Sequence, residues 1–137
     1  MWSHYACGHK GLCLQFENKV GLFAGRSCES PINIRYSSRF PLVSEMAEPA
    51  EHIKKTILTK SHRWRYEYEW RFIDPDGGPG YRAFDARFLS GVIFGAQMST
   101  QDKEHVRKWI SLGPTNPRLF QATIKPQEFA LTISPTE

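Results

Sequence analysis

The chain has 137 residues and a formal net charge of +4, with 18 lysines and arginines against 14 acidic residues. Its hydrophobic fraction of 40% beside 23% charged residues excludes intrinsic disorder, because such a chain buries enough apolar surface to offset the entropy lost on folding. The length fits one domain, 1–137, and no stretch has the roughly 18–20 apolar residues that a membrane span needs.

The N-terminal segment and the cysteines together predict a cytoplasmic protein without a metal site. Residues 1–10 lack the basic and apolar segments of a secretory signal peptide. The three cysteines, Cys7, Cys13 and Cys28, are odd in number and cannot all pair. Zinc-ligand residue types do occur over residues 4–13, but they lack the two separated pairs that are typical of zinc sites.

In chain order, the first half of the sequence predicts two strands and one helix. Residues 11–16 form a short, largely apolar segment, which is typical of a strand, and residues 17–30 are expected to form a loop. Residues 31–36 alternate, which places Ile and Tyr side chains on one face of a second strand. A helix is expected to begin at Pro49 and run to Leu58, because proline suits the first turn and isoleucines recur on one stripe.

Residues 64–73 carry the clearest strand pattern in the sequence, with aromatic residues at even positions and charged residues at odd ones. The aromatic set is Trp64, Tyr66, Tyr68, Trp70 and Phe72, and the charged set is Arg65, Glu67, Glu69 and Arg71. We predict that the aromatic face is buried in the core, so that Trp70→Ala costs about 3–5 kcal/mol. A turn rich in glycine and proline follows at 74–80.

The second half predicts further short strands, a helix and a terminal hairpin. Extended segments are expected over 81–85 and 91–95. A helix capped by Ser99 should end before Gly113, and strands over 119–124 and 129–133 should pair as a hairpin. The fold class is therefore α+β, with a mostly antiparallel sheet and about two helices.

The charged face of residues 64–73 has two interpretations. Glu67 and Glu69 stand about 7 Å apart on a strand, and flanking arginines would keep them ionised, as a preformed site requires. The alternative is a solvated sheet face whose ion pairs contribute little. Basic residues interleaved with aromatics over 54–71 also suggest single-stranded nucleic acid. We rank that partner lower, because the aromatics share a core face and the two glutamates repel phosphate.

Four segments of the chain resemble the domain-of-unknown-function 2971 family, which occurs in bacteria and phages. They are residues 1–6, residues 9–11 with the strand that ends at Phe16, Lys60 with residues 64–71, and residues 92–96 with the helix after Ser99. Family members usually have a longer N-terminal half, so the resemblance implies a truncated version of a longer domain, a misplaced start codon or a minimal relative. We then expect an exposed sheet edge near Trp2, Tyr5 and Leu14, and self-association.

Glu67-Tyr68-Glu69 is also similar to the Glu-x-Glu motif of ADP-ribosyltransferases, which are α+β domains that act on NAD. That resemblance implies a catalytic Glu69 at the nicotinamide ribose, Glu67 orienting a macromolecular acceptor, and Ser37-Ser38 in place of a Ser-Thr-Ser strand. It further implies NAD contacts from His4, Tyr5, Arg35 and Tyr36. The alternative is a non-enzymatic protein-binding module, regulatory or anti-defence, or an inactive remnant of a longer enzyme.

Overall fold

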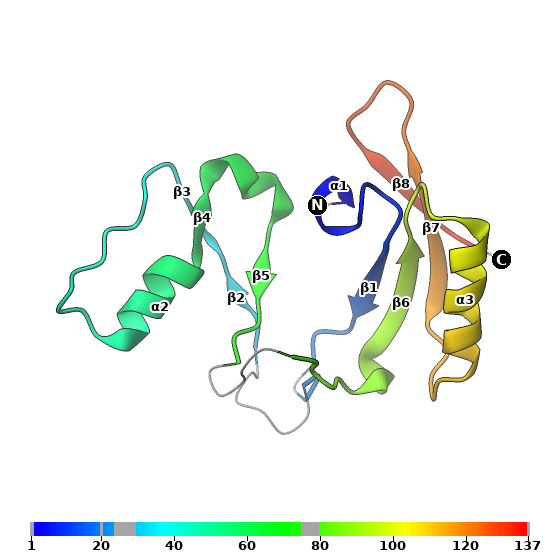
Figure 1. The fold of residues 1–137 in the computed structure, drawn as a ribbon, viewed down its shortest axis with the longest axis horizontal. Coiled ribbons are helices and arrows are strands. Elements are labelled where there is room, and N and C mark those ends of the chain that lie inside the picture. Colours follow the sequence, from blue (N-terminus) through cyan, green and yellow to red (C-terminus); the bar gives the residue numbers. More distant parts are fainter. Residues whose placement is uncertain (1, 20, 24–29, 75–79, 137) are drawn as a thin grey trace. The chain divides into compact units, whose positions relative to one another are not determined.

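The computed structural model describes residues 2–19, 21–23, 30–74 and 80–136. They belong to two compact units: unit 1 comprises residues 1–24 and 83–137, and unit 2 comprises residues 25–82 (Figure 1). Cys28 and most of the predicted turn over 74–80 lie outside the described residues. The expectation of a single domain stays a prediction. Over the described ranges, no helix is long and apolar enough to cross a membrane.

Unit 1 is built on a four-stranded sheet in the order β1-β6-β7-β8. The strands are β1 Leu12–Phe16, β6 Leu89–Phe94, β7 Arg118–Ile124 and β8 Leu131–Pro135. β1 pairs antiparallel with β6, and β7 pairs antiparallel with β8, as the predicted terminal hairpin requires. The central pair, β6 and β7, is parallel, so the sheet is mixed.

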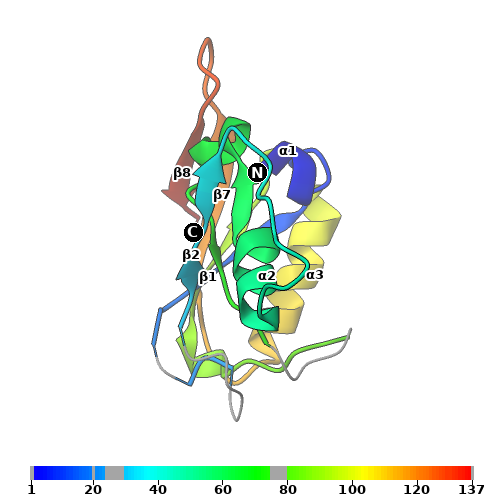
Figure 2. The ribbon, with the colours of Figure 1, turned by 90° about the vertical axis from the view of Figure 1, so that its left-hand side faces the viewer.

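A helical crossover makes that parallel pair possible, because parallel neighbours cannot be joined by a tight turn. Helix α3, Thr100–Ser111, leads from β6 to β7, and the Ser99 side chain caps it by accepting from the Asp102 N–H at 3.1 Å. Figure 2 shows α3 alongside the sheet. Val106 packs there against Val92 and Phe94 of β6, and these residues form the core of unit 1.

The N-terminal segment of unit 1 forms a short helix, α1, Trp2–Tyr5, which the sequence did not predict. The following loop packs on the end of β6, where Gly95 N–H donates to the Gly11 carbonyl at 2.9 Å. β1 is an edge strand, and both Leu14 and Tyr5 are exposed, as expected, whereas Trp2 is half-buried. Self-association through this edge stays a prediction.

The described residues of unit 2 contain two small sheets and one α-helix. β2 Ile32–Asn33 pairs antiparallel with β5 Trp70–Arg71, while β3 Arg35–Ser37 pairs in parallel with β4 Thr59–Ser61. The predicted strand over 31–36 is thus two strands with different partners, separated at the buried Ile34. Helix α2, Pro49–Ile57, starts at the predicted proline and forms the crossover from β3 to β4.

The prediction of one strand across 64–73 is wrong. Residues 62–67 form a 3-10 helix, η1 His62–Glu67, and Tyr68 ends it in the left-handed region at φ 46° and ψ 44°. Beyond that point only β5 is a strand. The predicted burial is also wrong, since the exposed fraction is 58% for Tyr66, 78% for Tyr68 and 58% for Trp70. The alternation persists over residues 66–72, but the aromatic side chains there face outward and the charged ones inward.

Two smaller predictions are corrected in unit 1. Residues 81–85 form no strand; a 3-10 turn, η2 Ala86–Phe88, leads instead into β6, where the Asp85 carboxylate accepts from the Arg87 N–H. Phe129 lies in the hairpin turn, fully exposed, rather than in the last strand. The α+β class itself is confirmed, with three α-helices among the described residues instead of two.

Candidate functional site

The charged residues of the 67–71 segment gather around one lysine of unit 2. Lys60 lies in the middle of β4, directly before η1. A 3-10 helix repeats every three residues, so Trp64 and Glu67 lie on the same side of η1, toward Lys60. The left-handed turn at Tyr68 then reverses the chain, and the extended residues that follow bring Glu69 and Arg71 to the same place.

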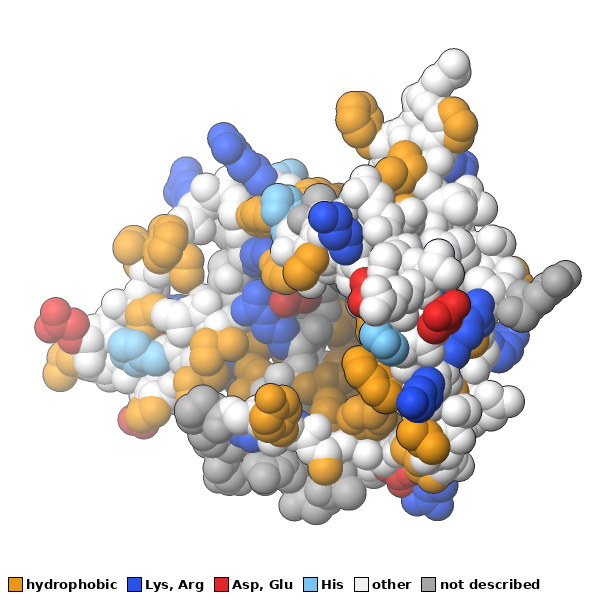
Figure 3. All heavy atoms as spheres, turned by 45° about the vertical axis from the view of Figure 1, so that its right-hand side comes forward, with side chains coloured by type: hydrophobic (Ala, Val, Ile, Leu, Met, Phe, Trp, Pro, Cys, Tyr) orange, Lys and Arg blue, Asp and Glu red, His pale blue; other side chains and the backbone are white. Residues whose placement is uncertain are grey.

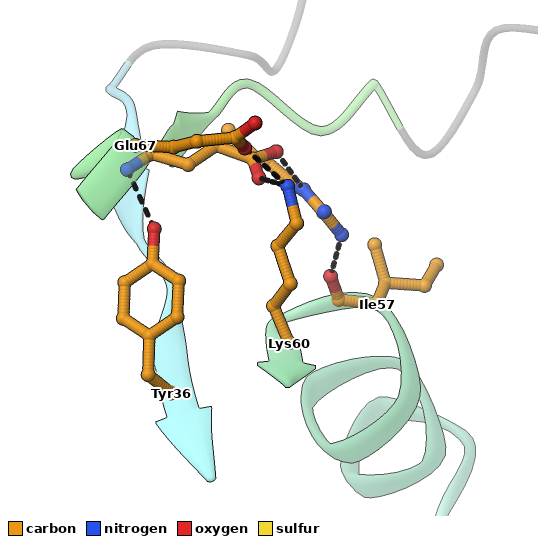
Figure 4. Close-up of polar contacts among 6 residues, drawn as sticks. Tyr36, Ile57, Lys60 and Glu67 are labelled. Carbon is orange, nitrogen blue, oxygen red and sulfur yellow. Dashed lines mark hydrogen bonds and ion pairs between the residues drawn. The ribbon is translucent and has the colours of Figure 1, made fainter. Parts of the chain in front are cut away.

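The contacts in this cluster form a continuous network, drawn in Figure 4. Lys60 Nζ donates to Glu67 Oε2 and, at 2.8 Å, to Glu69 Oε2. Arg71 Nε donates to the other oxygen of Glu69 at 2.5 Å, and its guanidinium also donates to the Ile57 carbonyl at the end of α2. We call Lys60, Glu67, Glu69 and Arg71 the carboxylate cluster.

Tyr36 holds the backbone beneath the carboxylate cluster. Its hydroxyl accepts a 2.8 Å hydrogen bond from the Glu69 N–H, and it lies opposite Lys60 in the parallel β3–β4 pair. The Ile34 N–H donates to the Glu69 carbonyl at 3.2 Å. Both peptide groups of Glu69 are therefore fixed from the β2–β3 segment, which makes the position of its carboxylate rigid.

Charge-assisted hydrogen bonds favour the ionised forms of Glu69 and Lys60, against the effect of burial. The side chains of Glu67, Lys60 and Glu69 are only 5%, 14% and 25% exposed. The hydrogen bond from Arg71 lowers the pKa of Glu69 below its usual value; burial opposes this and Lys60 reinforces it. For Lys60, burial opposes the charge, but the hydrogen bonds to both glutamates outweigh it and raise the pKa of the ammonium group. Paired charges of this kind tolerate a half-buried position.

A hollow of about 290 Å³ opens beside Lys60 between β3, β4 and the end of α2. A second hollow, also of about 290 Å³, adjoins it and shares five of its lining residues: Ser37, Arg39, Phe40, Pro41 and Thr59. The other lining residues include the cations Arg35, Lys55 and Lys60 and the hydroxyls of Ser38, Thr56 and Ser61. We call this pair the basic hollow. Lys60 belongs both to it and to the carboxylate cluster.

The structure brings together three of the residues that the sequence singles out: Tyr36, Glu67 and Glu69. Arg35 lines the basic hollow, one residue from Tyr36 on β3. His4 and Tyr5 lie exposed on α1 in unit 1, so their convergence on the same site stays a prediction. Sequence reasoning missed the central role of Lys60, although its place among the family-like residues was a signal.

Metal chemistry finds no support in the described part of the chain. No group of three or more histidine, cysteine, aspartate or glutamate residues there is placed to hold an ion. Cys7 and Cys13 are both free thiols, and burial raises the pKa of Cys13.

One family model matches this chain. It is described as "Protein of unknown function (DUF2971)" and matches residues 1–72, just over half of the chain. The chain belongs to the DUF2971 family. The matched region includes α1 and the whole carboxylate cluster, whereas residues 92–96 and α3, which also resembled the family, lie outside it. No curated protein and no solved structure matches the chain.

Proposed function

We propose that unit 2 binds NAD and transfers its ADP-ribose group to a macromolecular acceptor. The observation that carries the proposal is the double role of Lys60, which lines the basic hollow and holds both carboxylates of the cluster. A dinucleotide seated in the hollow would have its sugar next to Glu67 and Glu69. Sites of this kind combine a concave surface with a few fixed polar groups.

The lining of the basic hollow suits the diphosphate of NAD. Guanidinium and ammonium groups bind phosphate oxygens by charge-assisted hydrogen bonds, and the hydroxyls of Ser37, Ser38 and Thr59 add neutral donors. Phe40 and Pro41 give the hollow an apolar wall of the sort that nucleotide rings use. The volume of each part is near the lower end of the range for ligand pockets, about 300–1,000 Å³.

The chemistry assigned to Glu69 follows from its ionisation. The bond between the ribose C1′ and the nicotinamide nitrogen breaks, nicotinamide leaves with the bonding electrons, and positive charge develops on the sugar. A fixed anion stabilises that charge in the transition state. The acceptor nucleophile then bonds to C1′ and loses its proton, and Glu67 is assigned to orient it. Tyr36 acts as a positioning residue through the Glu69 N–H.

Calorimetric titration with NAD tests the binding step, and release of nicotinamide tests the reaction. Glu69→Gln keeps the side-chain shape and removes the anion, so it should abolish release while NAD still binds. Glu128→Gln, on the exposed hairpin turn of unit 1, is the control and should be fully active. Each variant is assayed well below its melting temperature. Absence of both heat and nicotinamide release in the wild type would contradict the proposal.

A non-enzymatic protein-binding role is the second candidate, whether in a regulatory or anti-defence protein or in an inactive remnant. It is favoured by the loop between β3 and α2, where Phe40, Leu42 and Met46 are almost fully exposed. An apolar loop at the surface is typical of an interaction site. A pure interaction module should give no heat with NAD, so the same calorimetric titration separates the two candidates.

A further inference from the structure

We propose that unit 2 binds single-stranded nucleic acid along the outer side of residues 62–70. Two exposed arginines are followed there by three exposed aromatic rings, and the carboxylates of the same segment are turned inward. The binding residues are Arg63, Arg65, Tyr66, Tyr68 and Trp70. This inference is independent of NAD and concerns a surface on the opposite side of the segment from the carboxylate cluster.

The 3-10 geometry of η1 explains how the side chains separate. With three residues per turn, Trp64 and Glu67 face inward, which leaves Arg63 with Tyr66, and His62 with Arg65, on the outer sides. Tyr68 follows in the left-handed region, 78% exposed, and Trp70 on β5 is 58% exposed. These five binding residues, which we call the outer strip, are therefore all exposed.

Charge within the segment favours a polyanion on this strip. The side chain of Glu67 is 5% exposed and that of Glu69 is 25% exposed, and both are bonded to Lys60. Their negative charge is thus largely compensated on the inner side. Among the described residues, none forms an ion pair with Arg63 or Arg65, both of which are exposed. The two arguments against nucleic acid, a buried aromatic face and repulsion by glutamates, do not hold in the folded protein.

The aromatic rings point to single strands rather than duplexes. Stacking on a protein side chain requires an unstacked base, which a duplex does not offer. Tyr66 is held in place by Trp64, with ring centroids 6.0 Å apart, and Lys60 lies 5.0 Å from the centroid of the Trp64 ring. A ring that already packs against a neighbour loses little conformational entropy when a base stacks on it, so less of the stacking energy is offset.

The test is fluorescence anisotropy with labelled oligonucleotides of about 16 nucleotides, long enough for the site sizes of known single-strand binding domains. The full chain is titrated without NAD, so the result does not depend on the proposed transfer reaction. We expect binding that weakens with salt, and single strands preferred over duplex. Tyr68→Ala and Trp70→Ala should each weaken binding by about fivefold or more. Arg63→Glu with Arg65→Glu should reduce the salt slope by about 0.7 for each lost phosphate contact.

Matched controls separate this strip from general attraction to a basic protein. Phe129→Ala removes a fully exposed ring from unit 1, and Lys10→Glu with Lys108→Glu makes the same change of net charge on exposed residues of that unit. Both controls should bind like the wild type, and circular dichroism should show all variants folded. Binding weakened equally by the control and strip charge variants, or unaffected by loss of the rings, would overturn the proposal. So would a preference for duplex or no binding at low salt.

Discussion

Glu69 is the residue on which the two cations of the carboxylate cluster converge, and this determines how it responds to acid. Because Arg71 and Lys60 lower its pKa in the folded protein, its ionised form stabilises the fold above the pKa of the unfolded chain, about 4.3. That stabilisation is lost as the pH falls through the lower, folded pKa. The melting temperature of the wild type should therefore fall more steeply than that of Glu69→Gln between about pH 5 and pH 3.

The comparison is made by thermal melts followed by circular dichroism across that range. At neutral pH the variant should melt at a lower temperature than the wild type, since it loses charge-assisted hydrogen bonds. Glu128→Gln should show the wild-type slope, because Glu128 forms an exposed pair with Lys125. Parallel curves for the wild type and Glu69→Gln would show that the cluster does not couple ionisation to folding.

Tyr68 has a backbone conformation that glycine adopts more easily. Placing a residue with a side chain in the left-handed region costs roughly 1–2 kcal/mol. Glycine avoids this strain but loses more conformational entropy on folding, which costs about 0.5–1 kcal/mol. Since the ring is mostly exposed, Tyr68→Gly should raise the free energy of unfolding by about 0.5–1 kcal/mol, measured by urea denaturation. The same variant should lose affinity for single strands, so stability and binding should change in opposite directions.

Tyr66→Gly is the matched control for this effect. Tyr66 lies inside η1, where its backbone is not left-handed, and it is also exposed. Glycine there should lower the free energy of unfolding by about 0.5–1 kcal/mol. Destabilisation of similar size by both glycine variants would show that no strain is relieved at Tyr68.

At the scale of elements, the end of β6 depends on a close approach of the N-terminal loop. A Cβ at Gly95 would come within 3.0 Å of the backbone carbonyl groups of His9 and Gly11. At Gly91 it would meet the end of the flexible Gln15 side chain at 2.6 Å and the Phe120 ring at 3.0 Å. The backbone cannot move aside as easily as the end of a glutamine side chain. Gly95→Ala should therefore destabilise the fold more than Gly91→Ala does, and overpacking of this kind costs about 1–3 kcal/mol.

Chemical denaturation of the two alanine variants measures the difference. A larger loss for Gly91→Ala would indicate that the loop over residues 7–11 moves aside without cost. The wild-type hydrogen bonds from Gly95 to Gly11 and from Gln97 to His9, both 2.9 Å, argue that it does not.

Elements with local signals are predictable from this sequence. Proline at the start of α2 and the Ser99 cap of α3 fix helix starts through groups within one turn, and the terminal hairpin follows from two alternating segments. The parallel pairs β3–β4 and β6–β7 were not predicted, because each is created by a helical crossover that local alternation does not record.

The shared face of Glu67 and Glu69 was predictable from the sequence, but its orientation and the contacts with Lys60 were not. Alternation separates the aromatic side chains from the charged ones over 66–72, and it correctly places Glu67 and Glu69 together. Hydropathy alone then assigns the aromatic face to the core. It is wrong here because Lys60, from a neighbouring strand, and the Ile57 carbonyl supply hydrogen-bond partners for the charges. Such partners come from tertiary contacts, and the sequence of the segment itself does not indicate them.

At the scale of the whole molecule, few hydrophobic side chains are fully enclosed. The buried ones among the described residues are Leu22, Ile34, Val92, Phe94, Val106 and Ala122. Figure 3 shows hydrophobic groups at the surface, interspersed with lysines and arginines. A large share of the aromatic residues therefore contributes little to stability, and the core of unit 1 should dominate it.

Phe94 and Trp70 test this distribution of stability directly. Phe94 has no exposed surface and packs against α3, so Phe94→Ala should lower the free energy of unfolding by about 3–5 kcal/mol. Trp70 is 58% exposed, and Trp70→Ala should cost about 1 kcal/mol or less, in place of the large loss that a buried tryptophan would give. Urea denaturation monitored by circular dichroism measures both. A loss for Trp70→Ala as large as that for Phe94→Ala would mean that the ring is enclosed in solution, and the proposed nucleic-acid strip would lose one of its three rings.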